Sequence, residues 1–343
     1  MDSRFTPREI KELMQYATPE EKVLLEEYID GYIREEAPIF VPQSGPQRAV
    51  FESDADVIGV GGSAGGGKTA IICGLALTKH TKSLIIRRES VQLRSIKDTL
   101  ISMVGSTKGL NEQLGIWKNP VPGKSIEFGY LDSPGDEENY RGRDHDLLAL
   151  DEVTELKEDQ VRFIQAWVRT VIPGQQCTVI MSFNPPRKRE GMWVIKYFAP
   201  WLDVNHPNPA LPGEKRWFAI IDGQDVEVSD NRPFILGEDE NEFIYDFNPN
   251  EYSSIDIIKP ESRVFIPARV TDNVFLDDRY IRKLQALPEP LRSQMLRGDF
   301  QYEFDDDPMQ VIPAQWVEEA MARWELPRNS RFRPDSPGSR EHS

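Results

Sequence analysis

Residues 61–70, with the sequence GGSAGGGKTA, constrain the fold of this chain more than any other stretch. Five of these ten residues are glycine, which loses more conformational freedom on folding than any other residue. A flexible linker is also rich in glycine, but its glycines follow no fixed spacing. Here Gly62 is followed, after four residues, by Gly67, Lys68 and Thr69, which is the spacing of a phosphate-binding loop.

The residues around this loop predict a strand before it and a helix after it. Apolar residues 57–60 precede the loop and apolar residues 71–77 follow it. This context separates a true phosphate-binding loop from a chance match, because successive backbone N–H groups and a helix N-terminus together bind anions. We expect Lys68 to contact the β- and γ-phosphates and Thr69 to bind Mg²⁺. The loop residues predicted to contact nucleotide are Gly62, Ser63, Ala64, Gly65, Gly66, Gly67, Lys68 and Thr69.

Apolar β-type runs alternate with helical patterns after this point. The runs lie at 57–60, 83–86, 146–150 and 178–183. Such alternation is typical of βαβ units around a parallel sheet that is buried on both faces. We therefore predict an α/β fold, a P-loop NTPase with a mainly parallel central sheet flanked by helices and a small lid or linker subdomain.

The chain of 343 residues divides into five predicted parts. Proline and acidic residues become frequent after about residue 200, and an apolar strand-like run returns near residue 264. Strand-like residues 217–221 interrupt the acidic part, and helical patterns resume over 277–298 and 313–325. The predicted parts are an N-terminal helical segment (1–40), a P-loop ATPase core (41–202), an acidic insertion (203–262), a returning strand with lid or linker helices (263–327) and a disordered tail (328–343).

Nothing in the sequence indicates a membrane or secreted protein. No apolar run approaches the roughly 20 residues that a transmembrane helix needs. The charged N-terminal segment lacks the apolar stretch of a secretory signal. The two cysteines, Cys73 and Cys177, provide neither a disulfide framework nor a metal-binding spacing. We therefore expect a soluble, intracellular protein with no membrane partner.

The net charge of −16 at pH 7 argues at first against a nucleic-acid partner. The negative charge is concentrated in residues 222–261, which hold 12 acidic and two basic residues. Basic residues gather elsewhere, and a local cluster sets the local field whatever the net charge. For each basic cluster, contact with DNA and a solvated charged face are equally open. The two clusters are Arg87, Arg88, Arg94 and Lys97, and Arg187, Lys188 and Arg189.

Residues 147–152, LLALDE, place two carboxylates at the end of a predicted buried strand. An acidic residue at the carboxyl end of a parallel strand points into the crevice where ligands of such folds bind. We expect Asp151 to hold Mg²⁺, usually through a water molecule, and Glu152 to orient and deprotonate the attacking water. Paired acidic residues are common on protein surfaces, but four apolar residues directly before them are not.

Three further polar residues lie beside the predicted strands. Asn184 follows the run 178–183, where it could sense the γ-phosphate and pass hydrolysis on to the basic residues after it. Alternatively, Asn184 and Pro185 could form a simple turn. Arg141 and Arg143 lie in one short loop before the acidic strand and could present a guanidinium to charge developing on phosphate. A salt bridge within the chain is the alternative for either arginine.

The order of these features resembles the large terminase subunit of tailed bacteriophages and related viruses, the ATPase that packages DNA into a capsid. The resemblance runs from about residue 10 to residue 325. GGSAGGGKT and LLALDE resemble the Walker A and B motifs of this family, and SFNPP (182–186) resembles its coupling motif. Residues 45–53, GPQRAVFES, are similar to its adenine-contacting segment, with Gln47 as the contact. Residues 266–273, 280–284 and 296–300 are similar to further segments of the family, which are more specific than the Walker motifs.

The resemblance implies an ATP-hydrolysing motor that translocates double-stranded viral DNA into a procapsid, with ATP and Mg²⁺ as cofactors. It implies a homo-oligomeric ring, a capsid portal protein and a small terminase subunit as partners, in the cytoplasm of the host cell. The arginine finger of the family, which acts on a neighbouring subunit, maps best onto Arg141, with Arg143 as its rival. Asn184 would contact nucleotide and couple hydrolysis to movement.

The resemblance has one departure. Large terminases normally continue into an RNase H-like nuclease domain whose acidic residues bind two metal ions. After Trp324 a short polar tail remains, and the run Asp305, Asp306 and Asp307 is more typical of solvated charge than of a metal site. We therefore expect ATPase activity without nuclease activity in this chain. The alternative functions are a nucleic-acid helicase and a nucleotide-switched assembly ATPase that does not act on DNA.

Overall fold

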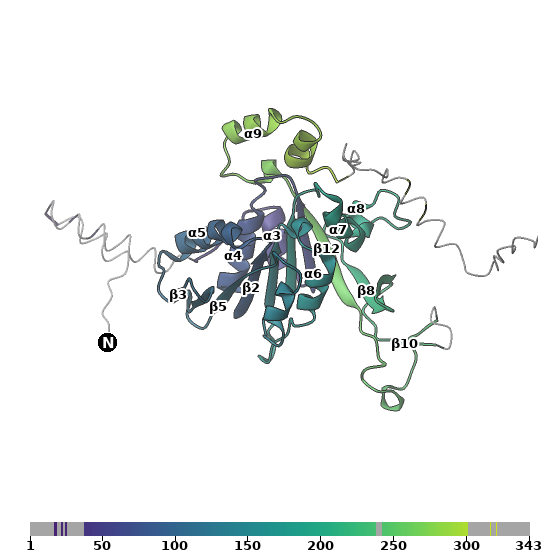
Figure 1. The fold of residues 1–343 in the computed structure, drawn as a ribbon. Helices are drawn as coiled ribbons and strands as arrows, with labels where there is room; N and C mark the ends of the chain where they lie inside the picture. The colour runs from purple at the N-terminus through teal and green to yellow at the C-terminus, as the bar shows by residue number, and fades with distance from the viewer. Residues whose placement is uncertain are drawn as a thin grey trace, which may run out of the picture. The chain divides into compact units, whose positions relative to one another are not determined.

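The computed structural model describes residues 38–237 and 242–300, together with the single positions 17, 18, 22, 25, 316 and 320 (Figure 1). The N-terminal helical segment predicted over 1–40 lies almost entirely outside the described residues. The helical pattern predicted over 313–325 does so too, apart from two positions, and the tail predicted over 328–343 lies wholly outside them. The described residues between 38 and 300 belong to a single compact unit.

In this described part, a ten-stranded sheet has the order β3-β4-β5-β2-β6-β7-β1-β12-β8-β9. The six central strands run parallel to one another, and both edges are antiparallel. The parallel strands are β5 (Ser125–Tyr130), β2 (Lys82–Arg87), β6 (Leu147–Asp151), β7 (Thr178–Phe183), β1 (Val57–Gly62) and β12 (Glu261–Ala268). The edge strands are β3 (Leu110–Asn111), β4 (Ile116–Lys118), β8 (Arg216–Ile221) and β9 (Gln224–Val228).

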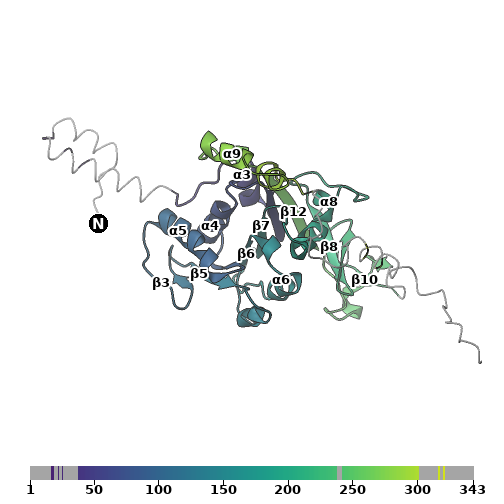
Figure 2. The same ribbon diagram turned by 45° about the horizontal axis from the view of Figure 1, so that its top comes forward.

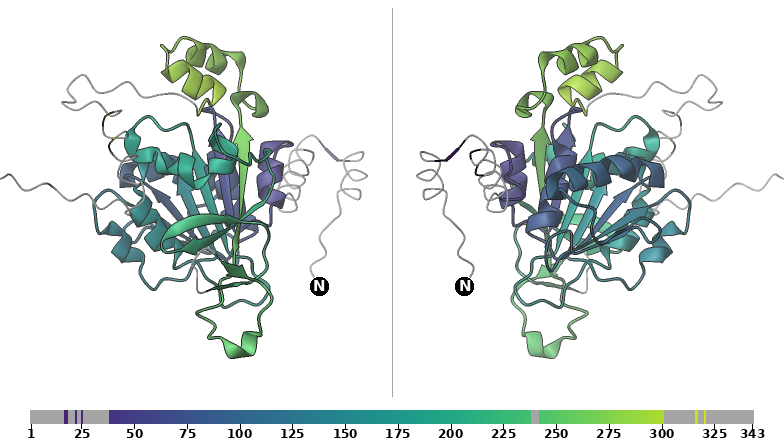
Figure 3. Two further views of the ribbon diagram at one scale, coloured as in Figure 1. Left: turned by 90° about the vertical axis from the view of Figure 1, so that its right-hand side faces the viewer. Right: turned by 90° about the vertical axis from the view of Figure 1, so that its left-hand side faces the viewer.

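Helices cover both faces of this sheet (Figure 2; Figure 3). One face packs against the first three described helices, and the other face against the next three. The first group is α3 (Pro46–Glu52), α4 (Lys68–Thr78) and α5 (Leu93–Val104). The second group is α6 (Glu158–Gln165), α7 (Trp193–Tyr197) and α8 (Ala199–Leu202).

Every residue of β1 is buried, because successive side chains of a strand point to opposite faces and both faces are covered. Ile58 lies in the apolar cluster beneath α4, whereas its neighbour Val57 lies in the cluster beneath α6 and α7. The predicted strands at 57–60, 83–86, 146–150 and 178–183 are all present. The predicted α/β fold with a mainly parallel sheet flanked by helices is confirmed.

The acidic residues predicted as an insertion over 203–262 contribute two strands to the central sheet. β8 contains the strand-like residues 217–221 and pairs with β12, and β9 pairs with β8 in an antiparallel hairpin. The remainder includes β10 (Ile235–Leu236) and β11 (Phe243–Ile244), which pair with each other. The sheet strand β12 begins at Glu261, within the last two residues of the predicted insertion.

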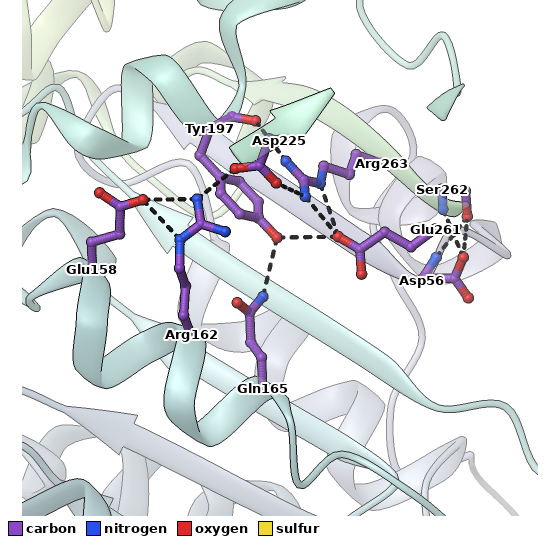
Figure 4. A network of polar contacts seen from close by, with 9 residues as sticks. All are labelled: Asp56, Glu158, Arg162, Gln165, Tyr197, Asp225, Glu261, Ser262 and Arg263. Carbon is purple, nitrogen blue, oxygen red and sulfur yellow. Dashed lines mark hydrogen bonds and ion pairs between the residues drawn. The ribbon is translucent and has the colours of Figure 1, made fainter. Parts of the chain in front are cut away.

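A buried arginine connects this hairpin to the rest of the core (Figure 4). Arg263 of β12 is 0% exposed, and its guanidinium lies 3.8 Å from the centre of the Tyr197 ring. Asp225 of β9 accepts hydrogen bonds from both Arg263 and Arg162 of α6. Burial alone would raise the pKa of Asp225, but the two arginines outweigh it and lower that pKa. One carboxylate thus joins β9, β12 and α6, and a buried charge left without such partners is strongly destabilising.

The helical pattern predicted over 277–298 is present as two short helices. They are α9 (Asp278–Gln285) and a π-helical turn, Ser293–Arg297. Pro288 and Pro290 lie between them, and proline cannot continue a helix because it lacks the N–H donor. This segment follows β12 and, as described below, contacts the glycine-rich loop.

Candidate nucleotide-binding site

The glycine-rich loop connects β1 to α4, as the sequence predicts. Gly65 and Gly67 have φ of 80° and 76°, which residues with a side chain rarely adopt. Gly67 is the N-cap of α4, and a Cβ atom built there would lie 2.4 Å from the side-chain nitrogen of Gln47. The loop glycines therefore meet a requirement for unusual backbone angles and, at Gly67, for close approach. Six of the eight predicted loop residues, Gly62 to Gly67, lie before the first turn of α4, which begins with Lys68 and Thr69.

Lys68 has a buried side chain that is held at two oxygen atoms. Its Nζ donates a hydrogen bond to the Ser63 carbonyl at 2.7 Å and another to Asn184 Oδ1 at 2.8 Å. Burial lowers the pKa of Lys68, and the nearby Glu152 and Asp151 carboxylates oppose this shift. The ammonium group therefore lies within the loop, among acceptors that keep it oriented.

Asp151 ends β6 and accepts hydrogen bonds on both carboxylate oxygens. Oδ2 lies 3.3 Å from Thr69 Oγ1, and Oδ1 accepts from Ser182 Oγ. Ser182 lies opposite Asp151 in the register of β6 and β7. A carboxylate oxygen and a hydroxyl oxygen thus meet at the start of α4, and oxygen ligands are the ones that Mg²⁺ prefers. Thr69 and Asp151 therefore fit a bound magnesium ion.

Arg87, the last residue of β2, also contacts Asp151. Its Nε and Nη2 atoms lie 2.9 and 2.6 Å from Asp151 Oδ2. The sequence places Arg87 in a basic cluster open to DNA, and its contact with Asp151 was missed. The contact follows from the order of the strands. Ile86 of β2 pairs with Leu150 of β6, so the next residue of each strand, Arg87 and Asp151, lies at the same edge of the sheet.

Glu152 follows Asp151 in a left-handed backbone conformation, with φ 58° and ψ 48°. This conformation is uncommon for residues other than glycine, and such strain is concentrated at functional sites. Asn184 Nδ2 lies 3.3 and 3.2 Å from the two Glu152 carboxylate oxygens. Burial and then the Asp151 charge raise the pKa of Glu152, while the Lys68 charge opposes the rise. A carboxylate with a raised pKa is better suited to accept a proton near neutral pH.

A cavity of about 670 Å³ opens beside Glu152 and Asn184. Its size falls within the range of roughly 300–1,000 Å³ that is usual for small-molecule sites. Basic side chains from both predicted basic clusters contribute to its wall. The lining residues include Arg87, Arg88, Glu152, Asn184, Arg187 and Lys188.

Gln47, predicted to contact adenine, lies directly against the glycine-rich loop. Its Nε2 donates to the Gly67 carbonyl at 3.1 Å, and its Oε1 accepts from the Gln43 N–H at 3.0 Å. The side chain is buried, and α3 holds it there. Gln47 is thus positioned at the loop, and contact with adenine stays a prediction.

The segment after β12 contacts the outer side of the loop. Asn273 Nδ2 donates to the Gly65 carbonyl at 2.8 Å, and the Met295 carbonyl accepts from the Ala64 N–H at 2.8 Å. Gly298 approaches so closely that a Cβ atom on it would lie 2.7 Å from the Gly62 Cα. The π-helical turn and the residue that follows it therefore meet the loop partly through backbone atoms.

The structure brings together the predicted residues of the loop, both Walker B acidic residues, Asn184 and Gln47, but neither Arg141 nor Arg143. Arg141 Nη2 lies 2.7 Å from a Glu138 carboxylate oxygen, and its guanidinium lies 5.5 Å from the centre of the Phe163 ring. Arg143 contacts Glu127. Neither arginine lines the cavity. Within one chain, each arginine therefore makes its contacts away from the glycine-rich loop.

Neither a cluster of metal-binding side chains nor a membrane-spanning helix occurs in the described part of the chain. No group of three or more His, Cys, Asp and Glu side chains there could together hold a metal ion. Asp305, Asp306 and Asp307 lie outside the described residues. Among the helices that the structure describes, none combines the length and the apolar character needed to cross a membrane.

Comparisons with known proteins give one family and several solved structures. A family model described as "Terminase large subunit, T4likevirus-type, N-terminal" matches residues 60–318. No curated protein sequence matches significantly.

The solved structures have low sequence identity to this chain. The ADP complex of the large terminase from a thermophilic bacteriophage is 14% identical over 74% of this chain and 52% of its own, with a TM-score of 0.46. The complex of that terminase with ATP-γ-S is also 14% identical over 74% and 52% of the two chains, with a TM-score of 0.44. The ATPase domain of the Thermus phage P74-26 large terminase is 15% identical over 74% and 93%, with a TM-score of 0.41. This chain spans about half the length of the first of these terminases.

Proposed function

Because this chain belongs to the terminase large subunits, matching the N-terminal model of the T4likevirus type, we propose that it is the ATPase of a DNA-packaging motor. The motor would translocate double-stranded viral DNA into a procapsid. The observation that carries the proposal is the side chain of Asn184, which contacts both Lys68 and Glu152. A residue that contacts both the proposed phosphate-binding lysine and the candidate base can respond to a nucleotide bound between those two side chains.

The nucleotide-binding roles would fall on residues in the glycine-rich loop or beside it. The backbone N–H groups of the loop and Lys68 would bind the phosphates, and Gln47 would contact adenine. Thr69 and Asp151 would hold Mg²⁺, which when bound neutralises charge on the transferring phosphoryl group. The short distance between their oxygen atoms supports this pairing.

Hydrolysis would depend on the proton-accepting carboxylate of Glu152. Glu152 would orient a water molecule and accept its proton, and the raised pKa of this carboxylate supports that role. Asn184 holds the carboxylate through its amide nitrogen, so a change at Lys68 can reach Glu152 through a single side chain. Asn184 is followed within five residues by the basic cluster Arg187, Lys188 and Arg189, which would carry the change to DNA.

Arg141 would act on the nucleotide of a neighbouring subunit in a homo-oligomeric ring. Its side chain is 59% exposed, which leaves the guanidinium within reach of a second copy. The portal protein and the small terminase subunit would be the other partners, in the host-cell cytoplasm. No nuclease chemistry is proposed for the described residues, among which no cluster of metal-binding side chains occurs.

The test is the rate of ATP hydrolysis with and without double-stranded DNA, and with and without the portal. We expect DNA to stimulate hydrolysis in the wild type, and Lys68→Ala to abolish it because the loop loses its phosphate-binding cation. Lys79→Ala, at the other end of α4, is the matched control and should keep the wild-type rate. A rate that DNA leaves unchanged would favour an assembly ATPase, and ATP-dependent strand separation would favour a helicase.

A further inference from the structure

Arg87 contacts the side chain that is proposed to hold Mg²⁺, and the proposed mechanism gives it no role. We propose that Arg87 is a γ-phosphate contact of its own chain, which exchanges the Asp151 carboxylate for the γ-phosphate of bound ATP. This inference rests on the proposed function of the site as an ATPase. It differs from the role of Arg141, which would act on the nucleotide of a neighbouring subunit.

Arg87 and a bound metal ion would compete for one oxygen atom. Asp151 Oδ2 accepts hydrogen bonds from two nitrogen atoms of Arg87 and from Thr69 Oγ1. A divalent cation held by Thr69 and Asp151 would lie beside the guanidinium at this same oxygen. The Asp151 side chain is only 1% exposed, and two cations beside one buried carboxylate oxygen repel each other more strongly than they would in bulk water. Magnesium binding therefore favours release of Arg87 from Oδ2.

The guanidinium of Arg87 borders a space into which it can move. Arg87 lines the 670 Å³ cavity together with Glu152 and Asn184, so its side chain borders the same space as the candidate base. Its side chain is 16% exposed and extends from the end of a central strand, which leaves its Cα fixed while the guanidinium turns. The γ-phosphate of a nucleotide on Lys68 would enter this space next to Glu152.

A phosphate is the better acceptor for Arg87 in that space. Glu152 is the alternative acidic acceptor, since it lines the same cavity as Arg87. A guanidinium bound to Glu152 would occupy the oxygens that have to accept the proton of water. A γ-phosphate instead offers several oxygens to the planar fork of an arginine, which binds phosphate in a bidentate manner. The phosphate is therefore the acceptor that is compatible with hydrolysis.

The experiment measures binding rather than turnover. Calorimetry gives the dissociation constants of Mg²⁺·ATP-γ-S and Mg²⁺·ADP for the wild type, Arg87→Gln and Arg87→Lys. Loss of a charged hydrogen bond should weaken Mg²⁺·ATP-γ-S binding to Arg87→Gln by roughly tenfold to a hundredfold. Binding of Mg²⁺·ADP should stay unchanged or become tighter, because Asp151 no longer has to exchange a guanidinium for the metal.

Arg94→Gln is the matched control, since Arg94 belongs to the same predicted basic cluster but is exposed and does not line the cavity. It should leave the ratio of the two dissociation constants at the wild-type value. Arg87→Lys keeps the charge without the fork and should give an intermediate ratio. If Arg87→Gln does not fold, as judged by circular dichroism, the ratio for Arg87→Lys decides.

The failure of this role and the failure of the ATPase function give different results. Equal weakening of both nucleotides in the Arg87 variants, or no weakening at all, would overturn the γ-phosphate role and leave Arg87 as a residue that positions Asp151. Failure of the folded wild type to bind either nucleotide would instead overturn the proposed ATPase function, before any variant is considered.

Discussion

Lys68 and Asn184, separated by 116 residues in the sequence, are joined by a hydrogen bond of 2.8 Å between Nζ and Oδ1. The nitrogen of the same amide contacts the Glu152 carboxylate. An amide can serve both partners because it presents an acceptor to the ammonium and donors to the carboxylate. The lysine, the amide and the carboxylate are therefore expected to act together, and substitutions can separate their contributions.

Glu152→Gln should retain nucleotide binding and lose turnover. The amide keeps the shape of the side chain but cannot accept the proton of water, a loss that is expected to slow hydrolysis by about 10²–10⁴-fold. Single-turnover hydrolysis and calorimetry on the same preparation measure the two properties. A variant that hydrolyses ATP at the wild-type rate would show that Glu152 is a structural acid.

The pH dependence of kcat/KM should reveal the raised pKa of Glu152. Burial and the Asp151 charge favour the protonated form of this carboxyl group, and only the deprotonated form can act as a base. Activity should therefore be lost as the pH falls, with a midpoint above the value of about 4.3 that is usual for glutamate. Circular dichroism at each pH separates this titration from unfolding. Full activity down to the ordinary glutamate pKa would contradict the assignment.

Mixing two inactive variants should restore hydrolysis if Arg141 acts on a neighbouring subunit. Arg141→Ala subunits retain an intact Glu152, and Glu152→Gln subunits retain an intact Arg141. A ring that contains both brings the arginine of one next to the base of the other, and an arginine supplied by a second protein is worth about 10³–10⁵ in rate. The measurement is ATPase activity of the mixed assembly.

The same mixing experiment, with Arg143→Ala in place of Arg141→Ala, distinguishes the two arginines of this loop. If Arg141 serves only its salt bridge to Glu138, a demonstrably mixed assembly will show no recovery. Substitution of Arg141 would then change the thermal stability of the isolated subunit instead.

Asp225→Asn should destabilise the fold at neutral pH. Asp225 is the shared partner of Arg263 and Arg162, and removing one partner of a buried ion pair costs about 3–5 kcal/mol in free energy of unfolding. The pKa of Asp225 is lowered in the folded state, so its contribution is complete above the unfolded pKa of about 3.9 and is lost as the pH falls through the lower folded value. Urea unfolding at pH 7 and at acidic pH measures both effects.

Asp230→Asn provides the matched control in the same region. Asp230 pairs with Arg232, whose side chain is 63% exposed, and such solvent-screened surface pairs contribute little to stability. Equal stability of the two variants at pH 7 would contradict the role of Asp225 as the partner of the buried Arg263.

Much of the fold could be predicted from the sequence because it depends on short-range patterns. Strands buried on both faces require continuous apolar runs, and the runs before the glycine-rich loop and before Asp151 have this form. The loop itself could be predicted because its glycines are required by local backbone angles that other residues rarely adopt. The apolar residues of β8 could be predicted for the same reason as the buried strands.

What could not be predicted depends on the order of strands that are distant in the sequence. Arg87 and Asp151 meet because β2 lies beside β6, and 64 residues separate the two side chains. β5 was missed because its alternation of Ile126 and Phe128 with polar residues is short. The addition of β9 to the sheet was missed as well, because it depends on pairing with β8 and on the contact of Asp225 with Arg263, which is 38 residues away in the sequence.

The contact between the Ala64 N–H and the Met295 carbonyl involves no side chain. Alanine scanning would therefore pass over it, because both positions keep their backbone groups whatever side chain they carry. The contact depends on the two backbone groups, so other residue types at these positions can keep it, except that a proline at position 64 would lack the donor. An ester bond in place of the amide between Ser63 and Ala64 removes this donor and makes the strength of the junction measurable. The same replacement makes the Ser63 carbonyl a weaker acceptor for Lys68, so the measured loss covers both contacts.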